Sequence, residues 1–243
     1  MTRGATRRAL LSLLLAVGLG ACDRGEDRVD LLEAGEPPRY SQSNEEVIIR
    51  DFFQDERDGF FVDIGCAWPV RNSTTYYLEK HLGWSGIGVD AVAAYGPRWL
   101  DKRPNAKFLH YAITNRSGGT IRFFQHDWPG VSSLSEEQAS GFGGPERLEE
   151  VAVPAITLDD LLDAQGVDRI DHLTIDIEGA ELQALEGFDI ERFRPRLVCV
   201  EAHTHGEPGE QALLRYFGEH GYARIDHYLA YELANWYFRP ASQ

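Results

Sequence analysis

Five short apolar runs recur along the chain, and they constrain its fold more than any other feature. They are FFVDIG, GIGVDA, KFLHYAI, HLTIDI and RLVCVEA, at 60–65, 86–91, 107–113, 172–177 and 196–202. Continuous rather than alternating apolar residues are typical of strands buried on both faces of a sheet. Between the runs lie helix-like stretches, among them STTYYLEKHL, TLDDLLDA and GAELQALEGF. This alternation predicts a doubly wound, Rossmann-like α/β domain with a mostly parallel sheet.

The C-terminal segment and one long insertion complete the predicted domain. The segment YARIDHYLAYELANWYF predicts two antiparallel strands that close one edge of the sheet, without a helix between them. Residues 115–156 form a long insertion between two predicted strands, and insertions of that length are often functional. We expect the insertion to cover the site and to select the substrate. The sequence shows no second domain, so we predict one domain over residues 43–243.

The first 22 residues have the layout of an export signal. Three arginines precede an apolar run from Ala9 to Ala21, an order typical of secretory signal peptides. The run is short against the roughly 20 residues that a permanent membrane-spanning helix needs. It ends in Leu-Gly-Ala-Cys, which resembles a bacterial lipobox. We therefore predict that residues 1–21 are a signal peptide and that Cys22 carries a lipid.

The segment that follows is predicted to be a tether. Residues 22–42 are polar, charged and interrupted by Pro37-Pro38, which is typical of a flexible linker. The prediction is thus a lipid-anchored protein of the cell membrane, with folded structure beginning near Ser43. The alternative is a true start codon downstream of Cys22, which would make the protein cytoplasmic.

The charge balance limits the partners of the chain. It has 24 Lys and Arg residues against 39 Asp and Glu residues, for a formal charge of -15 at pH 7. A surface of this sign repels nucleic-acid phosphates and anionic lipid headgroups. We therefore expect no nucleic-acid partner, and membrane contact only through the anchor. The three cysteines, Cys22, Cys66 and Cys199, show no Cys-x-x-Cys spacing, which argues against a disulfide framework or a zinc ribbon.

Acidic residues follow the predicted strands, where open parallel sheets bind their ligands. The first strand ends in Asp63-Ile64-Gly65, and the second ends in Asp90, where an acid typically holds both hydroxyls of a ribose. Together the two strand ends indicate a nucleoside site, although a single strand-end Asp is more often a helix cap. No G-x-G-x-x-G follows to seat a pyrophosphate. A nucleoside with a positive centre and no phosphate, such as S-adenosylmethionine, fits both observations.

An ordered set of motifs then resembles a known family. The strings are GFFVDIGCAWPVRNSTTYYLEKHLGWSGIGVDA, AITNRSGGTIRFF, VPAITLDDLL, IDHLTIDIEGAELQALEGFD and RPRLVCVEAH. Across roughly residues 40–240 the chain resembles the FkbM-type S-adenosylmethionine-dependent methyltransferases, which are similar to class I methyltransferases in fold. The resemblance implies S-adenosylmethionine as cofactor and methylation of a hydroxyl on a small molecule or glycan.

Residue by residue, the resemblance implies a cofactor site and a catalytic edge. Asp63 and Gly65 would line the methionine part of the cofactor, Asp90 would bind the ribose, and Ala112 lies where the fold usually places adenine. Asp176 and Glu178 would form the edge of the methyl-transfer chamber. One departure is Pro69, in an extended PVRNSTT loop where many members have a glycine.

The catalytic base has three candidates, Asp176, Glu178 and His203. A neutral imidazole can accept a hydroxyl proton near pH 7, but His203 is as readily a structural histidine. Glu181 lies one helical turn beyond Glu178, and we expect it on a solvated helix face.

Two other function classes remain open from the sequence. Because of the export signal and the Pro69 loop, the chain can also be a non-catalytic, membrane-tethered binding protein that retains the methyltransferase fold. A metal-dependent hydrolase is a weaker alternative, since carboxylate and imidazole groups suit Mg2+ or Mn2+. Its ligands would be Asp176, Glu178, Glu201, His203 and His205. The resemblance implies no metal.

Overall fold

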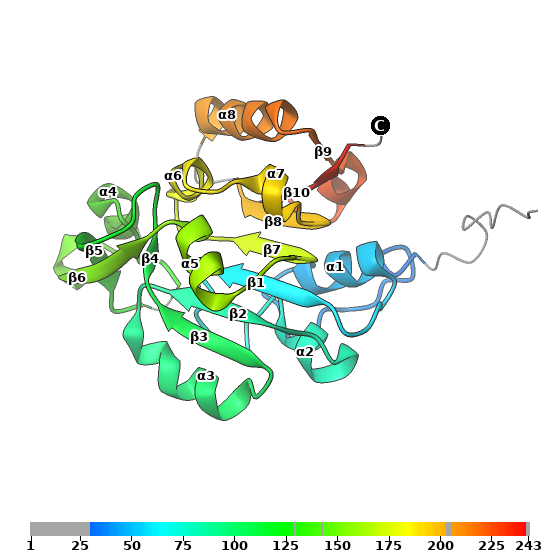
Figure 1. Ribbon diagram of the computed structural model, residues 1–243, viewed down its shortest axis with the longest axis horizontal. Coiled ribbons are helices and arrows are strands. Elements are labelled where there is room, and N and C mark those ends of the chain that lie inside the picture. Colours follow the sequence, from blue (N-terminus) through cyan, green and yellow to red (C-terminus); the bar gives the residue numbers. More distant parts are fainter. Residues whose placement is uncertain (1–29, 129, 142, 203–205, 242–243) are drawn as a thin grey trace, which may run out of the picture.

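Seven strands form the central sheet, in the order β3-β2-β1-β7-β8-β10-β9 (Figure 1). The computed structural model describes residues 30–128, 130–141, 143–202 and 206–241. The strands are β1 Phe60–Ile64, β2 Ser85–Asp90, β3 Ala106–His110, β7 His172–Ile175, β8 Leu197–Glu201, β9 Tyr222–Arg224 and β10 Asn235–Pro240.

The strand directions confirm the predicted fold class. The first five strands of the order pair in parallel, and β10 lies antiparallel to both β8 and β9. The sheet is therefore mostly parallel with an antiparallel C-terminal edge. The expectation of no helix in this edge was wrong, because the short 3-10 helix η4 Asp226–Ala230 lies between β9 and β10.

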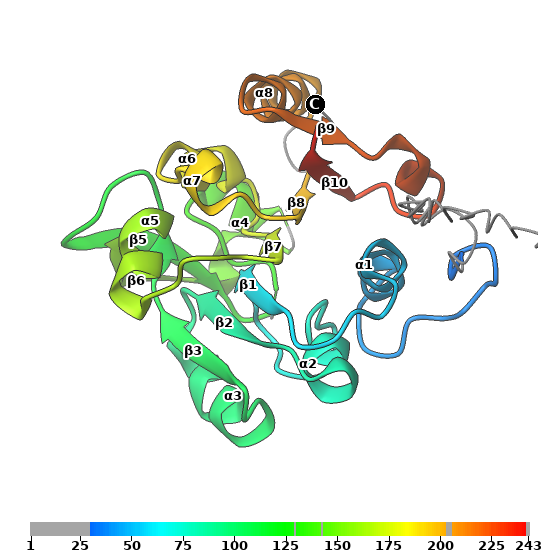
Figure 2. The same cartoon turned by 45° about the vertical axis from the view of Figure 1, so that its right-hand side comes forward.

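Helices cover both faces of the sheet (Figure 2). On one face lie α1 Glu45–Phe53, α2 Tyr76–Leu82 and α3 Gly96–Lys102; on the other lie α5 Leu158–Gln165, α6 Glu181–Glu186, α7 Ile190–Phe193 and α8 Gly206–Glu219. Alternate residues of β1 divide between the two cores, since Phe61 packs with α1 and α2 while Val62 and Ile64 pack with α5 to α8. Burial on both faces explains why the strands are continuously apolar.

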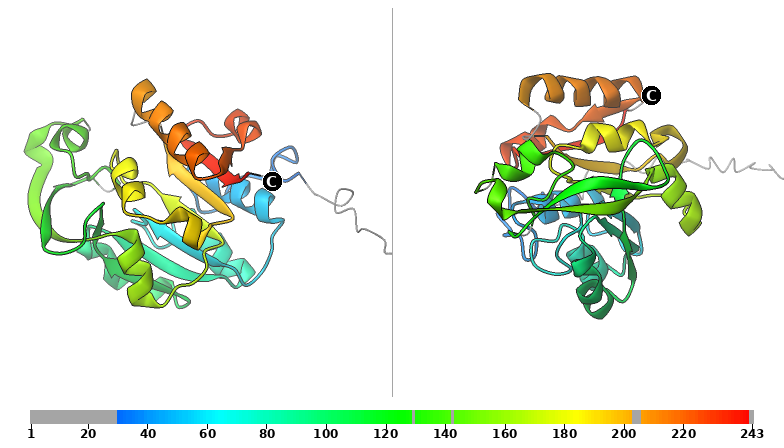
Figure 3. Two further views of the ribbon diagram at one scale, coloured as in Figure 1. Left: turned by 45° about the horizontal axis from the view of Figure 1, so that its top comes forward. Right: turned by 90° about the vertical axis from the view of Figure 1, so that its left-hand side faces the viewer.

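The predicted insertion folds as a small sheet beyond the ends of the central strands. It contains β5 Thr120–His126, α4 Glu136–Ser140, the 3-10 turn η2 Pro145–Arg147 and β6 Leu148–Ile156. Strand β6 pairs with β5 and with the short strand β4 Ala112–Ile113. Figure 3 shows this green sheet standing across one end of the central sheet.

Residues 30–42 pack against the domain, in contrast to the prediction of a tether over 22–42. Leu32 is buried in the core with α1 and α2, and the Leu31 amide donates to Asp51 Oδ1 over 3.3 Å. The buried Glu46 carboxylate accepts the amides of Arg39 (3.2 Å) and Tyr40 (2.9 Å). These contacts outweigh the polar composition, so within the described residues Leu31 and Leu32 already pack against the domain, well before Ser43.

The predicted signal peptide and Cys22 lie outside the described residues. Among the residues that the structure describes, no helix is both long enough and apolar enough to cross a membrane.

Candidate active site

A cavity of about 600 Å³ opens at the carboxyl ends of the central strands, below the insertion. The structure brings five of the predicted site residues together on its wall: Gly65, Asp90, Ala112, Asp176 and Glu178. The predicted base His203 and its neighbour His205 lie outside the described residues. The insertion contributes Phe123, Trp128 and the segment 130–132 to the cavity wall, as expected from its length and place in the chain.

Gly65 follows β1 and lies very close to the backbone of Asp176, which follows the neighbouring parallel strand β7. Its φ is 83°, and its amide donates to Val89 O over 2.9 Å. A Cβ at this position would lie 1.7 Å from the backbone oxygen of Asp176. No side chain fits in that space, so glycine is required here for the close approach of two backbones.

Asp90 closes the neighbouring strand end. Its Oδ1 accepts the amide of Val92 over 2.7 Å and its Oδ2 accepts the amide of Ala67 over 2.9 Å. Burial raises the pKa of Asp90 to about 6, against the effect of these two hydrogen bonds. Each carboxylate oxygen can accept more than one hydrogen bond, so Asp90 retains the capacity to bind two ribose hydroxyls at the cavity wall.

Asp63 does not lie on the cavity wall, contrary to its predicted cofactor role. Strand alternation places its side chain on the face of Phe61, toward α2, where Oδ2 accepts a 2.7 Å hydrogen bond from Thr75 Oγ1. Burial raises the pKa of this carboxyl. Asp63 therefore holds the loop after β1 through its hydrogen bond to Thr75. It does not line the part of the cavity predicted for the methionine part of the cofactor.

That loop is held by a buried arginine rather than by glycines. The guanidinium of Arg103, which is 1% exposed, forms an ion pair with Glu79. It also donates to Pro69 O (3.1 Å), Ser73 Oγ (3.3 Å) and Thr75 Oγ1 (3.1 Å). Pro69, the departure from the family pattern, is thus part of a fixed loop.

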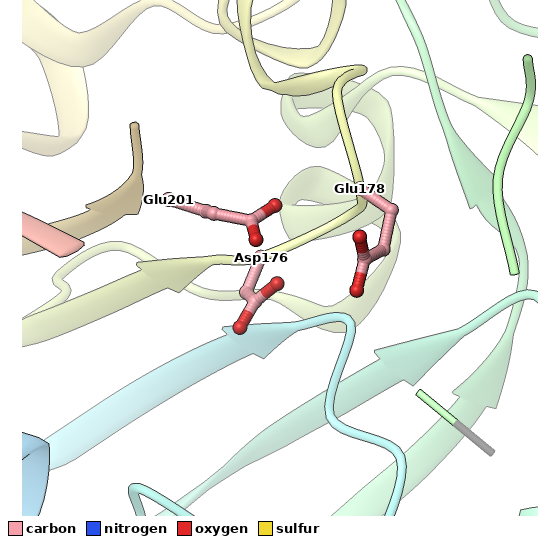
Figure 4. Close-up of side chains that lie close together, drawn as sticks. All are labelled: Asp176, Glu178 and Glu201. Carbon is pink, nitrogen blue, oxygen red and sulfur yellow. The ribbon is translucent and has the colours of Figure 1, made fainter. Parts of the chain in front are cut away.

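Three carboxyl groups meet at the ends of β7 and β8. In the parallel register Ile175 lies beside Val200, so the next pair is Asp176 and Glu201. Oxygens of Asp176, Glu178 and Glu201 all lie within 4.8 Å of one another (Figure 4). Burial, and then the charge of Glu178, raises the pKa of Asp176 well above its usual range. Burial also raises the pKa of Glu201, with a further contribution from Asp176.

The loop from Asp176 to Gly179 is fixed in an unusual conformation. Glu178 has a φ of 54°, which is uncommon for a residue with a side chain. The Oε1 of Glu181 accepts the amides of Ile177 (2.8 Å) and Gly179 (3.3 Å), and Ser133 Oγ donates to Glu178 O over 2.7 Å. Glu181 is fully buried, so the expectation of a solvated helix face was wrong: its carboxylate is needed for these loop amides.

The carboxyl cluster has the ligand type that a hard divalent cation prefers. The histidines of the metal-dependent alternative, His203 and His205, lie outside the described residues. Cys66 is buried, and burial raises the pKa of its thiol well above the usual value, so it stays protonated and is a packing residue rather than a nucleophile.

Aromatic side chains line the remainder of the cavity. Tyr111 and Phe123 lie near Ala112 on its wall, and Trp68 packs against Tyr95 with ring centroids 6.0 Å apart. Trp128 also lines the cavity and is 59% exposed. These planar apolar surfaces suit a flat base.

Comparisons with known proteins give one family and several distant structures. The sequence model of the methyltransferase FkbM domain matches residues 57–224. Among solved structures, a TehB-like S-adenosylmethionine-dependent methyltransferase from Corynebacterium glutamicum is 13% identical, with a TM-score of 0.42 over 79% of this chain and 78% of that chain. A methyltransferase from Geobacter sulfurreducens, in complex with S-adenosylhomocysteine, is 11% identical, with a TM-score of 0.39 over 84% and 76%.

A ribosomal RNA methyltransferase, putative, from Plasmodium falciparum is 13% identical, with a TM-score of 0.44 over 84% of this chain and 98% of that chain. These structures are too distant to carry an argument about function. No functionally curated protein matches the chain. The family model covers more than half of the sequence, and S-adenosylmethionine is the cofactor of that family. The chain therefore belongs to the FkbM family of S-adenosylmethionine-dependent methyltransferases.

Proposed function

We propose that the protein transfers the methyl group of S-adenosylmethionine to a hydroxyl oxygen of a small molecule or glycan. The observation that carries this proposal is the pair Asp176 and Glu178, two carboxyl groups with raised pKa values on the wall of the cofactor cavity. A hydroxyl nucleophile must lose a proton, and a carboxylate with a raised pKa is a stronger base than an ordinary one.

The residues of this chain have two tasks in such a transfer. When bound, the cofactor supplies an electrophilic methyl group on a sulfonium centre. The cavity wall orients the acceptor, and alignment alone provides effective molarities on the order of 10^5 M or more. Asp176 or Glu178 accepts the hydroxyl proton. The fixed backbone at Glu178, held by Glu181 and Ser133, keeps the base in one place.

The pH dependence tests the role of Glu178. Burial, and then the charge of Glu181, raises the pKa of Glu178 to about 7. Because a base works only when deprotonated, we expect the rate to rise as the pH increases through about 7 and to level off above it. Glu178→Gln should lower kcat about 10²- to 10⁴-fold and remove this rise. The measurement is formation of S-adenosylhomocysteine with a panel of sugars and hydroxylated metabolites.

Glu186→Gln is the matched control, because Glu186 is exposed at the end of α6 and binds Asn115 outside the cavity. It should leave both kcat and the pH profile unchanged. A methyl group found on nitrogen or carbon of the product would overturn the hydroxyl proposal. If folded protein bound the cofactor but methylated no acceptor in the panel, the reading as a non-catalytic binding protein would replace it.

A lipid anchor at Cys22 is a second part of the proposal, supported by the apolar run and the Leu-Gly-Ala-Cys end of residues 1–22. Expressed in full length in a bacterium, the protein should be recovered with the membranes, with an acylated N-terminal peptide beginning at Cys22 by mass spectrometry. Cys22→Ser should shift it to the soluble fraction. An intact N-terminus from Met1 in wild-type protein would contradict the anchor.

A further inference from the structure

The charges on the cavity wall are strongly unequal. Five carboxyl groups line the cavity, from Glu45, Asp90, Asp176, Glu178 and Glu201. Among the described lining residues, Arg71 is the only cationic side chain. S-adenosylmethionine carries a positive sulfonium and a terminal ammonium, both of which suit the acids, but it also carries a terminal carboxylate. These five groups offer an added carboxylate no opposite charge, and those that are ionised repel it, which leaves the neighbourhood of Arg71.

Arg71 lies on a loop that is anchored on both sides. Before it, Pro69 O accepts a hydrogen bond from Arg103, and after it Ser73 Oγ accepts another. The amide of Ser73 also donates to Tyr40 O over 3.1 Å. This bond ties the loop to the segment before α1, whose Gln42 and Ser43 line the same cavity. Arg71 is thus held at the cavity wall by a fixed backbone.

The Arg71 side chain is available for a ligand. It is exposed, and no described residue forms an ion pair or a hydrogen bond with its guanidinium. The other arginine that contacts this loop, Arg103, already binds Glu79 and three further hydrogen-bond acceptors. An arginine guanidinium binds a carboxylate through two parallel, charge-assisted hydrogen bonds. An amide or hydroxyl side chain cannot form this pair of bonds.

We infer that Arg71 binds the amino-acid carboxylate of the cofactor and so fixes which way the methionine part points in the cavity. This inference rests on the proposed function only in taking S-adenosylmethionine as the ligand. It gives the PVRNSTT loop a task that a glycine-rich loop cannot perform, because the loop presents a cation to the one anionic group of a ligand that otherwise needs an acidic site.

Two ligands separate this contact from the rest of the site. S-adenosylhomocysteine has the carboxylate, whereas 5'-methylthioadenosine has the same nucleoside without the amino-acid part. In calorimetric titrations of the full protein, Arg71→Met should weaken S-adenosylhomocysteine about 10- to 100-fold, the range for a charge-assisted hydrogen bond. Its affinity for 5'-methylthioadenosine should stay within twofold of wild type.

Two control variants make the result specific. Arg116→Met removes the same charge from an exposed arginine that does not line the cavity, and it should change neither affinity. Asp90→Ala removes the predicted ribose ligand and should weaken both nucleosides. Thermal unfolding of each variant checks that the fold is retained.

The outcomes are distinguishable. If Arg71→Met binds S-adenosylhomocysteine as tightly as wild type, or weakens both nucleosides equally, the inference is overturned while the cofactor site stands. If folded wild-type protein binds neither nucleoside, it is the proposed function that fails.

Discussion

Gly65→Ala is expected to abolish cofactor binding and to destabilise the protein severely. The added Cβ would lie 1.7 Å from the backbone oxygen of Asp176, so the ends of β1 and β7 must separate. This separation displaces both Asp176 and the loop after β1, which form adjacent parts of the cavity wall. Backbone overpacking of this kind typically costs about 1–3 kcal/mol, and the positive φ adds about 1–2 kcal/mol. Thermal unfolding and calorimetric titration with S-adenosylhomocysteine measure both effects.

Gly118→Ala separates the two causes. Gly118 also has a positive φ, 99°, but no atom lies within 4 Å of a Cβ at that position. It should therefore show only the cost of the backbone conformation and should bind the cofactor as wild type does. Equal losses of stability for the two variants would mean that the approach of Gly65 to Asp176 does not constrain the site.

Arg103→Met is expected to have the second large effect. It leaves the Glu79 carboxylate, with a side chain only 3% exposed, without its cation. Removing one partner of a buried ion pair typically costs about 3–5 kcal/mol, which corresponds to a fall in Tm of roughly 6–20 °C for a domain of this size. The loop from Pro69 to Thr75 also loses three hydrogen bonds, so affinity for S-adenosylhomocysteine should fall even where the variant is still folded.

Arg192→Met is the matched control for this variant. Arg192 forms an ion pair with Asp163 in which both side chains are about half exposed, and such pairs contribute only about 0–1 kcal/mol. A fall in Tm as small for Arg103→Met as for Arg192→Met would show that the buried network does not hold the loop.

The fold could be predicted because its signals are local. Each buried parallel strand is a continuous apolar run, and Thr157 caps α5 by accepting the amide of Asp160 over 3.1 Å, as the spacing of those residues indicates. The packing of residues 30–42 was not predictable in this way. Their polar composition gives no sign that the buried Glu46 needs two backbone donors from Arg39 and Tyr40.

The lining of the cavity was predictable where a residue ends a strand and less so elsewhere. Gly65, Asp90 and Asp176 follow their strands directly, so the topology brings them to one cavity. Asp63 was misplaced because the two-residue period of β1 turns its side chain toward α2. Glu201 was grouped with Asp176 as a possible metal ligand, and the parallel register of β7 and β8 places the two residues side by side. Glu181 could not be assigned from helical spacing, because its partners are amides of a loop with positive φ angles.

The position of strand β10 in the sheet has a consequence for how the sheet assembles during synthesis. It inserts between β8 and β9, two strands that precede it in the chain, and Ala234 and Asn235 at its start line the cavity. Domains generally fold as units during synthesis, and this sheet cannot close around β8 and β9 before residues 235–240 are available. Until residues 235–240 leave the ribosome, β9 has no neighbour and Glu201 has no partner strand on that side. The cavity wall is therefore complete only once the segment that follows β9 has been synthesised, so a chain that ends before β10 has an incomplete cavity.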